Sequence, residues 1–212
     1  MSEDKFMATN AAEINYICKK YRITNYTINN DMSVDINSDF RFRIKPKRTG
    51  RLPLNFNRIN GSFNCNNLGL TTLFGTPEYV YGYFDCGYNN LQSLEYLSKF
   101  IIGDFYCNDN KLTNIKNNST ITGSIRCYSN NLRTLENINY EDIRPFQSQN
   151  FFNKNPIEEI WKLFKNKKYI EHFNELDIIR DNGKTVILER LNYFLQDLGK
   201  DEVTSLKNYK TI

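Results

Sequence analysis

The sequence predicts an α/β solenoid, a parallel β array built from a short repeat with helical segments at both ends. Four segments share the pattern Gly-x-Phe/Ile-x-Cys, at residues 61–65, 82–86, 103–107 and 123–127, with spacings of 21, 21 and 20 residues. A β-branched residue lies two positions before each glycine, and Leu or Ile recurs five and eight positions after each cysteine. Because a unit this short cannot bury its own apolar face, it is stable only when neighbouring copies stack on it.

The first half of the repeat predicts a β-strand, because its apolar residues have period two. This period places the β-branched residue, the glycine, the Phe or Ile and the cysteine on one inward side. The β-branched residues are Ile59, Val80, Ile101 and Ile121. The residues between these positions would form the concave face of the array.

The second half of the repeat is where the chain must leave the sheet. Three positions after the cysteines stand Leu68, Asn89, Asn110 and Asn130. We expect the asparagines to bond backbone groups of neighbouring turns, since an amide side chain both donates and accepts hydrogen bonds. The apolar residues that follow would cover the core from the convex side; they are Leu70, Leu91, Leu112 and Leu132, then Leu73, Leu94, Ile115 and Leu135.

Residues 1–36 are predicted to form an N-terminal cap, because the end of a repeat array exposes its core. A helix is expected over residues 8–21, and strands over residues 23–28 and 33–36 around a turn at residues 29–31. The apolar face of this helix consists of Ile14, Ile17 and Cys18.

Residues 37–155 are predicted to form the solenoid, which begins with a degenerate repeat and ends with another. In the first, Phe40 and Phe42 occupy the positions that Phe63 and Cys65 occupy one repeat later, and Leu52 and Leu54 supply the convex side. In the last, Phe152 takes the cysteine position, Asn155 the asparagine position, and Ile157 and Ile160 the two leucine positions.

Residues 156–212 are predicted to form a C-terminal helical cap. Asn155, followed by Pro156 and two acidic residues, also indicates a helix start with Asn155 as the N-cap. Helices are expected over residues 156–164, 168–176 and 184–198, with Gly199 ending the last one.

The pattern I/V-x-G-x-F/I-x-C-x-x-N-x-L-x-x-L/I resembles the leucine-rich repeat, whose signature is L-x-x-L-x-L-x-x-N-x-L. Phe84, Cys86, Asn89 and Leu91 match its last four defined positions. The spacing of about 21 is similar to the short repeats of bacterial effectors, and the Gly-x-Phe-x-Cys opening to leucine-rich proteins of bacteriophages and bacteria. The resemblance implies a binding protein of viral or bacterial origin but does not specify its partner, because folds of this kind host many functions.

Composition and cysteine usage favour a cytoplasmic protein, in the host cytoplasm, or in the virion if a phage encodes it. No apolar run approaches the ~18 residues that a membrane span needs, and the N-terminus lacks the basic-then-apolar pattern of a secretion signal. Four of the five cysteines share one repeat offset, where a row of core thiols in a reducing compartment explains them better than disulfides. We expect no metal site and no cofactor, since no C-x-x-C spacing occurs.

Catalytic constellations are absent from the sequence, so we expect no enzymatic activity. The single histidine, His172, lies in a charged helical segment and is predicted to be a surface residue. Glu158 and Glu159 are adjacent on a predicted helix, where neighbouring side chains do not face one cleft, and both suit the helix dipole.

The outward positions of the strands are rich in tyrosine, the residue type that protein interfaces favour. The preference of β-sheets for aromatic residues explains the same tyrosines equally well. The predicted partner-binding residues on the concave face are Tyr81, Tyr83, Asp85, Tyr88, Asp104, Tyr106, Arg126 and Tyr128.

Basic residues are concentrated between positions 41 and 58, where no acidic residue occurs. These are Arg41, Arg43, Lys45, Lys47, Arg48, Arg51 and Arg58. Since seven positive charges exceed the net charge of +4, the rest of the chain is net negative. A nucleic acid or other polyanion could dock there, although a solvated sheet edge that prevents aggregation is favoured.

The sequence therefore predicts a non-catalytic interaction protein or scaffold that holds a protein partner on its concave tyrosine-rich face. Binding of a nucleic acid or polyanion by the basic residues is the alternative. The sequence names neither the partner nor the oligomeric state.

Overall fold

The computed structural model describes residues 8–46, 50–116, 118–134, 154–181 and 183–212. The chain divides into two units: Met1–Lys111 with Asn117–Arg126, and Leu112–Lys116 with Cys127–Ile212. Among the described residues, no helix is both long enough and apolar enough to cross a membrane.

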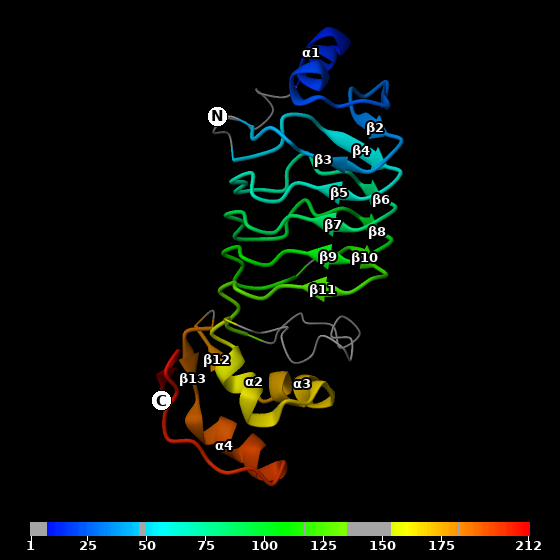
Figure 1. Ribbon diagram of the computed structural model, residues 1–212. Coiled ribbons are helices and arrows are strands. Elements are labelled where there is room, and N and C mark those ends of the chain that lie inside the picture. Colours follow the sequence, from blue (N-terminus) through cyan, green and yellow to red (C-terminus); the bar gives the residue numbers. More distant parts are fainter. Residues whose placement is uncertain (1–7, 47–49, 117, 135–153, 182) are drawn as a thin grey trace. The chain divides into compact units, whose positions relative to one another are not determined.

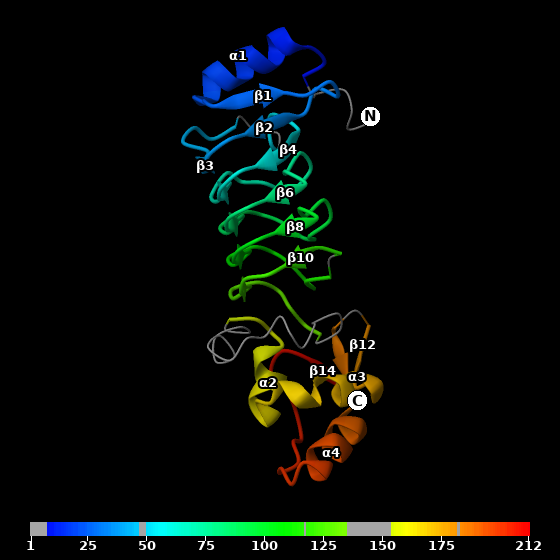
Figure 2. The same cartoon turned by 90° about the vertical axis from the view of Figure 1, so that its right-hand side faces the viewer.

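The first unit contains two sheets of short strands, and each repeat supplies one strand to each sheet (Figure 1). The order of the first sheet is β1-β2-β4-β6-β8-β10, and Figure 2 shows its strands in a row; the order of the second is β11-β9-β7-β5-β3. All neighbours are parallel except β1 and β2. This arrangement is compatible with a repeat, solenoid-like α/β fold.

The strand bounds follow the repeat. The first sheet comprises β1 (Tyr26–Ile28), β2 (Val34–Ile36), β4 (Phe56–Ile59), β6 (Tyr79–Val80), β8 (Phe100–Ile101) and β10 (Thr120–Ile121). The second comprises β3 (Phe40–Arg41), β5 (Phe63–Asn64), β7 (Phe84–Asp85), β9 (Phe105–Tyr106) and β11 (Ile125–Arg126).

The single strand predicted for each repeat is divided in two by a corner at the glycine. In one repeat, β6 ends at Val80 and β7 begins at Phe84, with Gly82 between them. A Cβ atom added at Gly103 would lie 2.7 Å from the carbonyl carbon and oxygen of Gly82. Glycine therefore recurs because successive turns approach too closely at this corner for any side chain.

The predicted core positions are buried in the described residues, with one exception. The inward Ile or Val, the Phe or Ile, and the convex leucines are inaccessible to solvent, except that Ile121 is half-buried. All five cysteines are buried with free thiols, as predicted, Cys18 included. Leu135 and Phe152 lie outside the described residues.

The asparagine row bonds the backbone as predicted; it consists of Asn89, Asn110, Asn130 and Asn155. In the first unit, Oδ1 of Asn89 accepts from the N–H groups of Leu68 and Leu70, at 3.0 and 2.9 Å, and its Nδ2 donates to carbonyls at 65, 86 and 87. In the second unit, Oδ1 of Asn155 accepts from the N–H groups of Asn130 and Leu132. Asn155 therefore occupies the asparagine position, as the repeat frame predicts.

The N-terminal elements are close to those expected. Helix α1 (Ala11–Tyr21) starts three residues later than predicted, because the side chain of Asn10 caps it by accepting from the N–H of Glu13. Ile14 and Cys18 are fully buried, whereas Ile17 is only half-buried. The strands β1 and β2 form the predicted antiparallel hairpin.

The second unit contains helices in the three predicted segments and, in addition, a sheet that the sequence did not predict. It comprises α2 (Glu158–Phe164), η3 (Lys167–Tyr169), α3 (Ile170–Glu175) and α4 (Leu188–Asp197), with β12 (Ile179–Arg180), β13 (Thr185–Val186) and β14 (Lys210–Thr211). The order of the sheet is β12-β13-β14, so β13 occupies residues predicted as the start of the last helix. Gly199 follows α4 in a left-handed conformation (φ 64°), as a helix end requires.

The prediction that Asn155 is the N-cap of α2 is wrong. The helix begins at Glu158 after Ile157, which makes no side-chain capping bond. The amide of Asn155 bonds backbone groups at 127, 130 and 132 instead, so only its main-chain carbonyl, which accepts from the N–H of Glu158 at 3.0 Å, serves the helix start.

Candidate functional site

Four predicted partner-binding residues of the second sheet are linked into one network. The hydroxyl of Tyr106 donates to Oδ2 of Asp104 at 2.9 Å, and the guanidinium of Arg126 lies 4.9 Å from the centre of the Tyr106 ring. The ring of Tyr83 meets that of Tyr106 edge to face at 5.9 Å. Burial and the bond to Asp104 raise the pKa of Tyr106, which favours the protonated hydroxyl that donates this bond.

Asp85 is occupied by its own neighbours rather than presented to a partner. Its Oδ2 accepts from the side-chain amides of Asn64 and Asn66, at 3.0 and 2.8 Å, and its Oδ1 accepts from the N–H of Gly87. The part of the predicted face around Asp85 is therefore mainly a structural polar network.

The first sheet carries an outward row that the sequence analysis missed. Arg58, Tyr79 and Phe100 are register partners on β4, β6 and β8. The rings of Tyr79 and Phe100 stack at 5.4 Å and 6°, and the guanidinium of Arg58 lies 5.8 Å from the Tyr79 ring centre. Extending the period-two pattern by one residue before Ile59, Val80 and Ile101 would have identified the row.

Tyr81 and Ile102 continue this surface at the corner between the sheets. They directly follow the paired strands β6 and β8, and the N–H of Ile102 donates to the carbonyl of Val80 at 2.9 Å. Their exposed fractions are 52% and 51%, and that of Phe100 is 41%. We call Tyr79, Tyr81, Phe100 and Ile102 the aromatic corner; it places aromatic and aliphatic side chains side by side in solvent.

Tyr88 and Tyr128 do not occupy equivalent positions. Tyr88 and Asp109 belong to a column of residues in the left-handed conformation, with φ of 56° and 53°. Ser129 holds that place after Cys127, with φ of 54°, so Tyr128 is one residue earlier in the repeat. This column directly precedes the asparagines, and the turn geometry explains it without reference to a ligand.

Among the described residues, the predicted basic residues do not all lie together. Arg41 lies on β3 of the second sheet and Arg58 on β4 of the first. Lys45 lies close to Gly69. Arg41 and Arg43 border a cavity beside β3. Lys47 and Arg48 lie outside the residues that the structure describes. Arg51 lies apart from that cavity.

A cavity of about 430 Å³ lies beside the edge strand β3 of the second sheet. Its walls come from the end of α1, from residues 36–43, and from the following turns at Ser62 and Tyr83. Arg22, Arg41 and Arg43 line it together with Asp39. We call this the arginine cavity.

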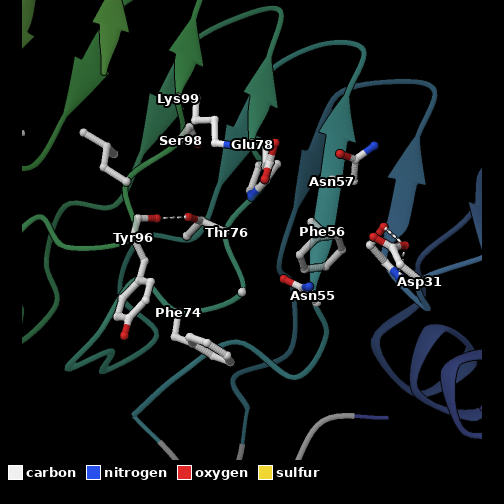
Figure 3. A pocket seen from close by; sticks show the side chains of 14 residues that line it. Asp31, Asn55, Phe56, Asn57, Phe74, Thr76, Glu78, Tyr96, Ser98 and Lys99 are labelled. Carbon is white, nitrogen blue, oxygen red and sulfur yellow. Dashed lines mark hydrogen bonds and ion pairs between the residues drawn. The ribbon is translucent and has the colours of Figure 1, made fainter. Parts of the chain in front are cut away.

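A second cavity, of about 250 Å³, lies where successive turns enter the first sheet (Figure 3). Its charged groups are already paired: Lys99 bonds Glu78 at 2.9 Å, and Asp31 accepts from the N–H and hydroxyl of Ser33. These bonds from Ser33 lower the pKa of Asp31. Thr76 donates to the carbonyl of Tyr96 at 2.6 Å. The cavity therefore presents little unsatisfied charge to a ligand.

The residues considered for catalysis, Glu158, Glu159 and His172, contact neighbouring residues of the fold. Each carboxylate of Glu158 and Glu159 accepts backbone bonds, from the N–H of Lys154 and from those of Lys207 and Asn208, respectively. His172 is partly exposed, and its ring lies 5.6 Å from that of Phe194. This agrees with its prediction as a surface residue.

The comparisons with known proteins identify no relative. No family of known proteins matches this sequence, and no curated protein or solved structure matches it significantly.

Proposed function

We propose that this chain is a non-catalytic interaction protein whose repeat surface holds a protein partner. The observation that carries the proposal is the aromatic corner, where Tyr81, Phe100 and Ile102 are exposed side by side on neighbouring turns. Aromatic residues bury a large area with little loss of side-chain entropy, and clustered exposed apolar groups mark interaction sites.

The aromatic corner also has the layout of an interface centre with a polar rim. Arg58 lies at one end of the Tyr79–Phe100 stack, and the Lys99–Glu78 ion pair lies one residue before it along the strands. Tyr83, on the other side of Gly82, extends the surface toward the Tyr106–Arg126 network. We therefore place the partner on the first sheet and its corner, and retain Tyr83, Tyr106 and Arg126 as its flank.

The fold assignment behind this proposal is a solenoid of the leucine-rich-repeat-like type with helical caps, of phage or bacterial origin and acting in a reducing cytoplasm. Two features support the solenoid and the reducing compartment. The asparagine row follows the repeat frame as far as Asn155, and the thiols are free and buried. Measuring the shape of the full chain by small-angle scattering tests the solenoid; a profile typical of a globular particle would contradict it.

The test of function is affinity capture from the native cell with two matched variants. Tyr81→Ser with Ile102→Ser removes the most exposed side chains of the aromatic corner, and we expect it to abolish enrichment of the partner. Tyr193→Ser is the control, because Tyr193 is 55% exposed on α4, outside the repeats. A partner retained equally by both variants, with unchanged melting temperatures, would contradict the proposed surface.

A further inference from the structure

The arginine cavity carries a net positive charge, because three arginines and only one carboxylate, that of Asp39, line it in the part of the chain that the structure describes. Among the described residues, no carboxylate forms an ion pair with Arg22, Arg41 or Arg43, although ion pairs form elsewhere, as at Arg180 and Asp177. The three arginines come from two elements: Arg22 ends α1 in a left-handed conformation, and the others lie on and just after β3. Three arginines beside one carboxylate leave a positive charge that a bound anion would compensate.

We propose that the arginine cavity binds a ribonucleotide, with its phosphate held by the arginines. The guanidinium fork bonds two phosphate oxygens at once and stays charged at any physiological pH. At the end of α1, N–H groups of Arg22 and Ile23 bond the carbonyls of Lys19 and Cys18, which leaves fewer free carbonyls near the bound phosphate. The volume of about 430 Å³ is within the usual range for small-molecule sites.

Asp39 indicates that the anion carries a sugar. Its Oδ1 accepts from the N–H of Ser62 at 2.6 Å, which holds the carboxylate in place at the wall of the cavity. A carboxylate beside a phosphate site repels a bare anion but accepts hydrogen bonds from ribose hydroxyls, the role that acidic residues have in dinucleotide-binding sites. The hydroxyls of Thr24 and Ser62 line the same cavity and add polar partners.

Tyr83 supplies a flat surface for the base. Its ring is 40% exposed and borders the cavity, while the edge-to-face contact with Tyr106 holds it in place. Stacking of a base on such a ring does not depend strongly on base identity. Phosphate, ribose and base thus each meet a matching group.

A mononucleotide fits better than a long nucleic acid. Beyond Tyr83, Asp104 lies at the second sheet. Its carboxylate accepts hydrogen bonds from the hydroxyl of Tyr106 and from the N–H of Ser124, and these bonds fix its position. Asp85 lies on the same sheet. A polyanion running along these strands would pass both carboxylates, whereas a single nucleotide meets only Asp39.

The test is calorimetric titration of the full chain with AMP, at an ionic strength of about 0.01 M where charge interactions reach furthest. We expect saturable binding of AMP, weaker binding of ribose 5-phosphate, and no binding of adenosine. Arg41→Gln with Arg43→Gln should weaken AMP binding about a hundredfold, because each of the two arginines loses a charged hydrogen bond worth about tenfold.

Matched variants distinguish binding at the arginine cavity from a general effect of the protein's net charge. Lys111→Gln with Lys116→Gln removes the same net charge at exposed side chains outside the cavity and should leave the affinity unchanged. Tyr83→Ala should weaken AMP binding but not ribose 5-phosphate binding. If the glutamine variant does not fold, Arg41→Lys with Arg43→Lys keeps the charge and should still weaken binding, because lysine lacks the planar fork.

Three results would overturn the proposal: no saturable AMP binding, equal weakening by the two glutamine variants, or adenosine binding as tightly as AMP. None of them bears on the aromatic corner, whose test uses other residues and a protein ligand.

Discussion

Replacing Asn110 with leucine tests whether the asparagine row holds neighbouring turns together. Asn110 is only 9% exposed, and its Oδ1 accepts from the N–H of Leu91 at 3.0 Å. Its Nδ2 donates to the carbonyls of Cys86 at 3.0 Å and Cys107 at 3.2 Å. Leucine has a similar size but offers neither acceptor nor donor.

The expected loss in the free energy of unfolding is about 2–4 kcal/mol. The buried N–H of Leu91 loses the bond to Asn110, and an unsatisfied buried donor costs about 1–3 kcal/mol. The lost donor bonds add about 0.5–1.5 kcal/mol each, but only in part, because the carbonyl of Cys86 keeps its bond from Nδ2 of Asn89 at 2.9 Å.

Urea unfolding followed by circular dichroism measures this loss, with hydrogen exchange of the Leu91 amide as a local probe. We expect a lower midpoint with an unchanged slope, and faster exchange at Leu91. Lys111→Leu is the control, since the neighbouring lysine side chain is exposed. Equal midpoints and equal exchange rates for the two variants would refute the structural role of the asparagine row and the repeat register.

Two further predictions concern the corner and the buried thiols. Gly103→Ala should lower the free energy of unfolding by about 1–3 kcal/mol, because the added Cβ would lie 2.7 Å from backbone atoms. Gly87→Ala is the control and should cost less in thermal melts, since the nearest atom there is at 3.2 Å. A larger loss for Gly87→Ala would contradict the close approach of turns at the corner. Burial raises the pKa of the Cys65 and Cys86 thiols well above the ordinary 9.0. Above about pH 9 the unfolded chain therefore loses protons that the folded state keeps. The free energy of unfolding should then fall by ~1.4 kcal/mol per pH unit for each thiol. Cys86→Ala should flatten that slope by one thiol's share in unfolding titrations under reducing conditions, and an unchanged slope would count against the burial.

The repeat pattern predicts the core and the asparagine row because stacking forces equivalent residues into equivalent places. The position of Asn155 followed from its spacing alone, even after a 25-residue step. The same frame did not reveal the corner at Gly82, because close approach of two backbones leaves no trace except the glycine itself. It also began one residue too late to include Tyr79 and Phe100.

Features that depend on long-range packing were not predictable from local pattern. The strand at Thr185–Val186 pairs with β12 and with residues 210–211, and although both of its residues favour strands, two residues are too few to show a period-two pattern. Arg22 directly follows α1, and only the packing of the end of α1 beside β3 brings it to the cavity with Arg41. The charge cluster between residues 41 and 58 suggested one patch, whereas Arg41 and Arg58 lie on different sheets, because each repeat supplies one strand to each sheet.

Site-specific photocrosslinking tests the central claim, that the aromatic corner holds a protein partner. A photoreactive phenylalanine analogue replaces Tyr81 in one protein and Tyr193 in another; both positions are about equally exposed, at 52% and 55%. After irradiation in the native cell, we expect a discrete crosslinked partner from position 81 and none from position 193. A partner crosslinked from position 193 alone, or equally from both positions, would contradict the claim.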